Sequence, residues 1–245
     1  MKGTMLEDFL EPIKTESLKD VFVLRFEELI LSGKLKIGQK LPSERELALQ
    51  LGVSRPVVHE GLVLLTTRGL VSLKPRFGAT VNDYRKEGSI TLLSSLIHYQ
   101  KGKLEPELLE SLLQMRLLLE PPFARLAAEN RTQEQVREFQ RILETEESAD
   151  ARNTQMITDL DFDFHLLIAV ASGNTVYPLL LNSFRPVYTN LSGQFFKDPQ
   201  VITAVHLYHR NMIKAIEAGY GEKAMSVMKE ILCHGEKHLR RMIDR

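Results

Sequence analysis

The hydrophobic pattern divides the chain into two regions. Between residues 17 and 81, short apolar stretches with helical spacing are separated by polar breaks and are followed by two stretches that alternate like β-strands. From residue 89 to residue 243, apolar positions follow the helical period almost without interruption. The pattern predicts a mainly α protein with an N-terminal domain over residues 1–81, a linker over 82–88 and an all-helical bundle over 89–245.

In the first region, residues that start and end helices recur at short intervals, which indicates short helices joined by tight turns. Ser43 and Glu46 have the spacing of a capping box, which satisfies free N–H groups at a helix start. Gly52 ends that helix because glycine tolerates the left-handed turn, and Ser54 begins the next helix with Pro56 in its first turn. A winged helix-turn-helix is therefore predicted, with helices over about 17–31, 43–51 and 54–68 and wing strands over 70–73 and 79–81.

Composition first describes an ordinary globular protein. Of its 245 residues, 43% are hydrophobic and 26% are charged, and the formal net charge is zero. The single cysteine, Cys233, excludes an intramolecular disulfide and favours a cytoplasmic setting, and no apolar run reaches the ~18 residues of a membrane helix. Residues 34–81 nevertheless carry a net charge of +5, which the rest of the chain balances. A short basic module is typical of a domain that contacts nucleic acid.

The residues of this module resemble those of a known family. The stretch 33–48, with Leu-Pro-Ser-Glu-Arg-Glu at 41–46, and the stretch 51–58 are similar to the DNA-binding domain of GntR-family regulators. This resemblance implies a homodimer on a pseudo-palindromic double-stranded DNA operator. At the start of the recognition helix, Arg55 is placed to read base edges, since arginine pairs bidentately with guanine. The other expected DNA contacts are a second arginine, Arg45, and the phosphate-binding candidates Ser54, Lys74 and Arg76.

One segment departs from the family pattern. Where the family usually has Val-Arg-Glu-Ala, this chain has Val58-His59-Glu60-Gly61. His59 replaces a common guanine-reading arginine, and a neutral imidazole can donate one hydrogen bond but cannot form a bidentate fork. Gly61 costs ~1 kcal/mol of helix propensity relative to alanine. These changes leave the operator sequence open, and they would also permit a winged helix that serves protein interaction instead of DNA.

The second region resembles the FCD effector domain, which defines the FadR subfamily of GntR regulators. The resemblance is carried by the stretches 116–121, 161–165 and 171–174, and by His209 with the residues behind it. Prolines at 121, 122 and 186 fall inside predicted helices, where kinks or helix boundaries are expected. The predicted helices of the bundle span 89–101, 105–130, 132–149, 154–172, 175–193, 199–219 and 221–243.

A metal site is the first chemical implication of this resemblance. In many FCD domains an aspartate and three histidines bind a divalent metal (Zn, Ni or Mn here) that helps to hold an organic acid. Asp161 and His165 are four residues apart and project from one helical face, and His209 matches the third ligand. The fourth position holds Ile231, and His234 could replace it only after a helix shift or rotation. Alternatively, Asp161 and His165 form a hydrogen-bonded core pair without metal.

The effector itself has two candidate classes. Arg116, Asn174 and Arg185 are polar groups on apolar helices and could anchor a carboxylate or phosphate. Asn174 could equally cap the helix that follows it. The segments 174–182 and 188–189 also look like those of FadR proteins that respond to fatty acyl-CoA and lack the metal ligands.

We therefore predict a ligand-responsive transcriptional regulator, acting as a repressor, whose bundle senses a small organic acid through a metal. The alternative is the same architecture sensing an acyl-CoA without metal. A more remote alternative is a metal-dependent hydrolase or lyase built on Asp161, His165 and His209. That reading lacks an evident general base or nucleophile and leaves the first domain unexplained, so no enzyme activity is predicted.

Overall fold

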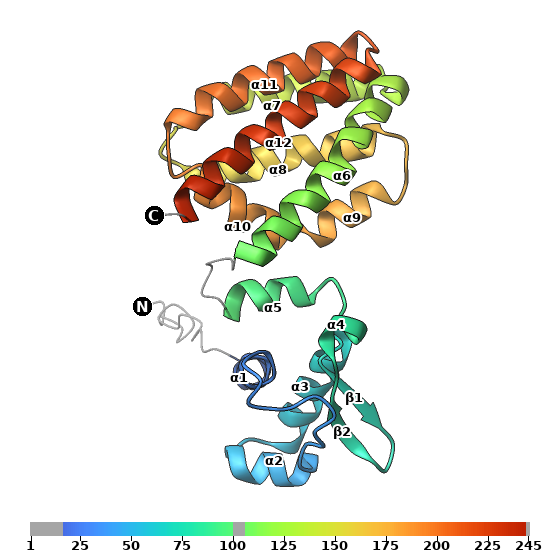
Figure 1. Cartoon of the computed structure of the whole chain (residues 1–245), viewed down its shortest axis with the longest axis vertical. Helices are drawn as coiled ribbons and strands as arrows, with labels where there is room; N and C mark the ends of the chain where they lie inside the picture. The colour runs from blue at the N-terminus through green and yellow to red at the C-terminus, as the bar shows by residue number, and fades with distance from the viewer. Residues whose placement is uncertain (1–16, 100–105, 244–245) are drawn as a thin grey trace, which may run out of the picture. The chain divides into compact units, whose positions relative to one another are not determined.

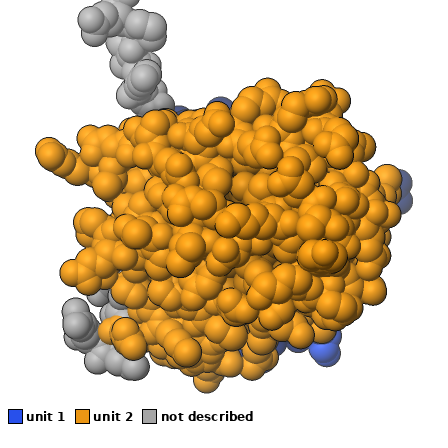
Figure 2. All heavy atoms as spheres, turned by 90° about the horizontal axis from the view of Figure 1, so that it is seen from above, with its two compact units in different colours: residues 1–99 blue, residues 100–245 orange. Residues whose placement is uncertain are grey.

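The computed structural model describes residues 17–99 and 106–243. The chain divides into two compact units, residues 1–99 and 100–245, which Figure 2 shows in different colours. Each unit has its own hydrophobic core. The N-terminal unit contains α1 (Leu18–Leu31), α2 (Glu44–Leu51), α3 (Arg55–Thr67), β1 (Val71–Lys74), β2 (Gly78–Val81), α4 (Tyr84–Glu87) and α5 (Leu92–Tyr99) (Figure 1).

The N-terminal unit is a winged helix-turn-helix, as predicted. The capping box at α2 is present, since the Ser43 hydroxyl accepts from the Glu46 N–H and the Glu46 side chain accepts from the Ser43 N–H. Gly52 closes α2 in the left-handed region at φ 66°, and this turn leads directly into α3. The wing is an antiparallel hairpin in which Val71 lies opposite Val81.

The packing of α1 on α3 explains the unusual glycine in the recognition helix. A Cβ at Gly61 would lie 2.3 Å from Cδ1 of Phe22. The Phe22 ring is buried and stacks on Phe26 at a centroid distance of 4.4 Å, so it cannot move aside easily. The helix-propensity cost of Gly61 is therefore offset by a close helix contact that alanine would obstruct.

The N-terminal unit extends beyond the predicted boundary at residue 81. Part of the segment predicted as a linker, 82–88, forms the short helix α4, and the following helix α5 packs on α1. A buried polar contact joins these helices: Glu27 of α1 pairs with Arg68 and accepts a hydrogen bond of 2.7 Å from Ser95 of α5. The first helix predicted for the bundle thus belongs to the N-terminal unit.

The C-terminal unit is an all-helical bundle around α8, which packs against α6, α7, α9 and α10 (Figure 1). Most of α8 is buried, and it supplies Phe162, Phe164 and Ile168 to the core. Within the described residues, this unit contains helices and no strands. Its helices are α6 (Pro106–Asn130), α7 (Gln133–Ser148), α8 (Thr154–Ala171), α9 (Tyr177–Ser183), α10 (Arg185–Phe195), α11 (Gln200–Glu217) and α12 (Gly221–Ile243).

The prediction of a single helix over residues 175–193 is wrong. The segment 175–193 forms two helices, α9 and α10, which meet at Phe184. Pro186 lies in the first turn of α10, where its missing N–H breaks no helical hydrogen bond, so the proline marks a boundary. By contrast, α6 continues through both Pro121 and Pro122.

Candidate functional site

Five of the six predicted DNA contacts line one concave surface of the N-terminal unit. Arg45 comes from α2, Arg55 and His59 from α3, and Lys74 and Arg76 from the wing. The sixth, Ser54, is exposed directly before α3, and its hydroxyl makes no capping hydrogen bond. These residues gather cations at the exposed start of the predicted recognition helix, as a phosphate-binding surface requires. We call this surface the basic concave surface.

Arg76 has a backbone conformation that most residues avoid. Its φ is 67°, and Arg76 is the one residue other than glycine with positive φ among the described residues. This conformation costs a non-glycine residue roughly 1–2 kcal/mol. It sits in the turn between β1 and β2, and such strain often marks a functional position.

An acidic side chain that the sequence did not single out lies on the same surface. Glu44 accepts from Arg55 Nε at 3.2 Å and is 2.8 Å from His59 Nδ1. The hydrogen bond from His59, supported by that from Arg55, holds the pKa of Glu44 below its ordinary value. Glu44 thus orients two neighbouring side chains on the predicted reading face of α3.

A second cluster lies in the bundle and contains the three predicted metal ligands. Asp161 and His165 project from α8, and His209 projects from α11. One ligand atom from each lies within 4.8 Å of the others, and the three residues are 7%, 2% and 0% exposed. This set is the only such His, Cys, Asp or Glu group found among the described residues. We call it the histidine–aspartate cluster.

Two buried glutamates that the sequence reasoning missed support the histidines. Glu120 of α6 lies 2.6 Å from His165 Nδ1, and Glu146 of α7 lies 2.9 Å from His209 Nδ1. Because an ionised carboxylate only accepts hydrogen bonds, each histidine donates through Nδ1 and keeps Nε2 for another partner. Metal-binding histidines commonly have this carboxylate contact on the second ring nitrogen.

The charges around the cluster are strongly coupled. Burial opposes ionisation of Glu120, but Arg116 and His165 outweigh it and lower its pKa to about 2. Burial likewise acts to lower the pKa of His209, yet the Glu146 carboxylate raises it above its ordinary value. Burial and the neighbouring Asp161 raise the pKa of Tyr188 well above its usual range. The tyrosine therefore stays protonated, and it donates to Asp161 Oδ2 at 2.8 Å.

His209 also has an unusual buried atom. Its Nε2 has no hydrogen-bond partner and lies 3.7 Å from Asp161 Oδ1. The ring is fully buried and stacks on Phe164 at a centroid distance of 3.8 Å. Burying a polar atom without a hydrogen-bond partner costs free energy. We therefore expect Nε2 of His209 to bind a group that the protein chain does not supply. The donor set of two imidazoles and one carboxylate suits a divalent transition metal.

The predicted fourth ligand lies beside the cluster but outside its compact group. His234 lines one cavity together with Asp161, His165 and Ile231, and its buried Nε2 has no hydrogen-bond partner. Burial lowers the pKa of His234. The compact group contains three residues only, so His234 completes no four-ligand set in this arrangement.

The three predicted effector anchors have different surroundings. Arg116 lines a cavity together with Asp161 and His165 of the cluster; it pairs with Glu120 and stands 4.4 Å above the Tyr188 ring. Asn174 accepts from the N–H groups of Val176 at 2.8 Å and Tyr177 at 3.3 Å, but the N-cap position of α9 is held by Val176. Arg185 is half exposed; its carboxylate partners are Asp159 and Asp163, and it stacks over Phe162.

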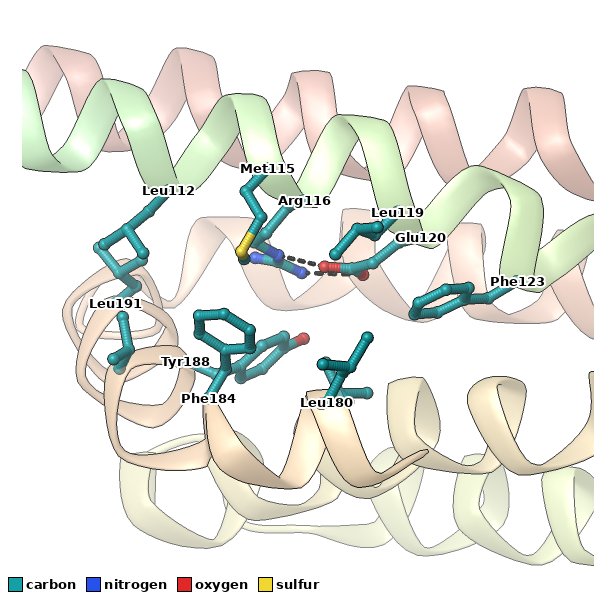
Figure 3. Close-up of a pocket in the computed structure, with 12 residues that line it drawn as sticks. Leu112, Met115, Arg116, Leu119, Glu120, Phe123, Leu180, Phe184, Tyr188 and Leu191 are labelled. Atoms are coloured by element: carbon teal, nitrogen blue, oxygen red, sulfur yellow. Dashed lines mark hydrogen bonds and ion pairs between the residues drawn. The ribbon is translucent and has the colours of Figure 1, made fainter. Parts of the chain in front are cut away.

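An apolar cleft adjoins the histidine–aspartate cluster. It lies between α6 and the α9–α10 pair and has about 450 Å³ of empty space, its open mouth included. Arg116, Glu120 and Tyr188 line this cleft, and Figure 3 shows the paired Arg116 and Glu120 facing Tyr188 across it. The remaining lining is apolar: Leu112, Met115, Leu119, Phe123, Leu180, Leu181, Phe184, Val187 and Leu191.

Comparison with known proteins finds a matching domain family for each unit. Residues 21–81 match the model of bacterial regulatory proteins of the gntR family, and residues 111–234 match the FCD domain. The chain is 36% identical over 182 residues to the HTH-type transcriptional regulator Mce2R of Mycobacterium tuberculosis, covering 73% of each chain. The chain belongs to the GntR family and carries an FCD domain.

Other relatives agree with this assignment. The fatty acid metabolism regulator protein of Klebsiella pneumoniae is 26% identical over 202 residues, covering 82% of each chain. A solved structure of Lar, a protein that controls the Listeria monocytogenes agr system, shares the fold with a TM-score of 0.64 at 17% identity, covering 94% of this chain and 99% of Lar. The families and named relatives are transcriptional regulators, which confirms the prediction that this GntR-family member is not an enzyme. In the described residues, no helix is long and apolar enough to cross a membrane.

Proposed function

We propose that this GntR-family regulator acts as a homodimeric repressor that senses a small organic acid through a divalent metal. The observation that carries the proposal is the unpartnered Nε2 of His209, which faces Asp161 inside the bundle. Both histidines of the cluster already use Nδ1 on buried glutamates, so their Nε2 atoms are the ones left for a metal.

Asp161, His165 and His209 would hold the metal, which would be Zn, Ni or Mn. When bound, it would supply a positive charge and open coordination positions for a carboxylate. Because His234 stands outside the compact group, a position is left for water or the effector. Arg116 would add a second positive group, since it lines the same cavity as Asp161 and His165.

In the N-terminal unit, we propose that the start of α3 enters the major groove. Arg55 is 72% exposed there, so its guanidinium is available for a base edge. Arg45 and the wing residues Lys74 and Arg76 would contact flanking phosphates, while Ser54 and the free N–H groups at the start of α3 would hold another. Two copies of this surface on a pseudo-palindrome would supply the affinity that a single copy lacks.

Effector and operator would be linked through the dimer. An effector that binds one arrangement of the dimer better than the other shifts the population between them, and typical coupling changes affinity by about 5–150-fold. The expected outcome is weaker operator binding when the acid is bound.

Fluorescence anisotropy with a selected operator duplex tests this proposal. Metal-loaded protein would be titrated in the presence of a panel of hydroxy- and dicarboxylic acids, with His209→Ala alongside. At least one acid should weaken operator binding at least about fivefold in the natural protein and leave His209→Ala unaffected. If no acid shifts the natural protein, or if the same acid shifts both equally, the metal-sensing proposal is wrong.

A second candidate effector, a fatty acyl-CoA, is favoured by the apolar cleft. Its nine apolar lining side chains suit an alkyl chain, and Arg116 at its wall suits a charged group. The Klebsiella pneumoniae relative is itself named a fatty acid metabolism regulator protein. In the same anisotropy assay, release of DNA by a long-chain acyl-CoA in both the natural protein and His209→Ala would favour this candidate over a metal-bound acid.

A further inference from the structure

The contact between Glu44 and His59 has a consequence for base reading. Glu44 Oε1 lies 2.8 Å from His59 Nδ1, while Glu44 Oε2 accepts from Arg55 Nε. The lowered pKa of Glu44 keeps this carboxylate ionised, and an ionised carboxylate accepts hydrogen bonds without donating any. The proton of the neutral imidazole therefore resides on Nδ1.

Fixing the proton on Nδ1 fixes the role of the other ring nitrogen. In the neutral ring Nε2 is a lone-pair acceptor, and in the protonated ring it becomes a donor. His59 is 58% exposed on the basic concave surface, one helical turn after Arg55 on the same side of α3. If Arg55 reaches a base edge, His59 lies within reach of a neighbouring one.

We infer that Glu44 makes His59 a reader of exocyclic amino groups. This inference rests on the proposed entry of α3 into the major groove. Neutral His59 accepts through Nε2 from the amino group of adenine or cytosine, which present the amino donors of that groove. Guanine and thymine present acceptors at the corresponding edge and are disfavoured. Protonation converts Nε2 into a donor and removes or reverses this preference.

Charged side chains from three elements share the basic concave surface with His59. Those facing it on the basic concave surface are Glu44 and Arg45 of α2, Arg55 of α3, and Lys74 and Arg76 of the wing. Of these groups Glu44 is the carboxylate, and its lowered pKa keeps it ionised, so Glu44 is the acceptor that fixes the proton of His59.

The test is a selection of binding sequences from a randomised DNA duplex pool by the full-length protein at about pH 8. His59→Ala identifies the base pair that His59 reads, because its sequence preference disappears there and persists elsewhere. Anisotropy with duplexes that differ only at this pair then measures the preference. Comparing duplexes at one pH cancels any effect of bundle histidines on overall affinity.

At pH 8, duplexes with adenine or cytosine at the read position should bind about five- to tenfold more tightly than those with guanine or thymine, as expected for one hydrogen bond. Glu44→Gln should lose the preference at pH 8, because an amide can donate or accept and no longer fixes the proton. Glu60→Gln, a charge-matched change of an exposed carboxylate on α3, should keep it.

Several results would overturn the inference. One is a selected motif with no position that responds to His59→Ala; another is a guanine preference at pH 8, and a third is an unchanged preference in Glu44→Gln. Thermal unfolding of each variant ensures that the compared proteins are folded. If the natural protein enriches no sequence at all, the proposed operator binding fails together with the inference, whereas an enriched motif that ignores His59 refutes the inference alone.

Discussion

Glu146 offers a way to perturb the proposed metal site without changing any ligand. It is 5% exposed, and its carboxylate oxygens lie 2.9 and 3.0 Å from His209 Nδ1. In Glu146→Gln the side-chain oxygen can still accept from Nδ1, but the negative charge is lost. A hydrogen bond to a charged group contributes about 1.5–3 kcal/mol against about 1 kcal/mol for a neutral one. The difference predicts zinc binding weaker by about 0.5–2 kcal/mol, or roughly 2–30-fold.

The assay is competition with a fluorescent zinc chelator at pH 8, using protein stripped of metal beforehand. The matched control is Glu147→Gln, the next residue on α7, whose side chain is 39% exposed and pairs with Arg210 at 2.7 Å. Zinc affinity should stay within about twofold of the natural protein in this control, because exposed ion pairs contribute little. Equal zinc affinity in Glu146→Gln, Glu147→Gln and the natural protein would refute the supporting role of Glu146.

Three further predictions concern packing, charge and DNA. Gly61→Ala should lower the free energy of unfolding by about 1–3 kcal/mol in urea titrations despite its better helix propensity, because the added Cβ meets Phe22; a stabilised variant would contradict this packing argument. The pKa of Glu120 is lowered from 4.5 to about 2, so its contribution is fully present above pH 4.5 and is lost as the pH falls toward 2. The stability advantage of the metal-free natural protein over Glu120→Gln should therefore shrink by about 3 kcal/mol across that window in acid titrations, and a constant advantage would argue against the ion pair. Arg55→Ala should weaken operator binding by about 1–3 kcal/mol, whereas Arg210→Ala in the bundle should leave both affinity and salt dependence unchanged; equal losses would place the DNA contacts elsewhere.

The winged helix could be predicted from the sequence because its boundaries depend on local chemistry. The capping box of Ser43 and Glu46 and the left-handed turn at Gly52 are short-range interactions that the chain shows directly. The helix boundary at Phe184 is harder to predict, because the helical spacing of apolar residues continues from α9 into α10. Within this segment, Pro186 is the one residue whose local chemistry indicates a boundary. Helix α5 was assigned to the wrong unit because its contact with Glu27 spans 68 residues.

In the candidate sites, too, the sequence predicts what depends on neighbouring residues and misses contacts between distant ones. Asp161 and His165 share a helix, so their spacing predicts a common face, and the resemblance supplied His209. The partners of these ligands could not be found in the same way. Glu120 and Glu146 lie 45 and 63 residues from their histidines, and nothing local marks a glutamate as buried. The one available signal was Glu120 four residues after Arg116 in a largely apolar stretch, the spacing of a helical ion pair.

The same reasoning applies to the DNA-binding surface. His59 could be recognised as a departure from the family pattern, but its role depends on Glu44, fifteen residues earlier and on another helix. The helix-turn-helix geometry brings the two side chains together, and only the folded arrangement shows that the Glu44 carboxylate lies against Nδ1 of the imidazole.

The most direct test of the central claim is an anomalous-difference map at the zinc absorption edge, from crystals of the zinc-loaded protein. The account predicts one strong peak per chain in the bundle, bonded to Asp161 and to Nε2 of His165 and His209 at about 2.0–2.2 Å, and no such peak in His209→Ala. A map of the natural protein without a peak at this cluster, or with the same peak in His209→Ala, would contradict it.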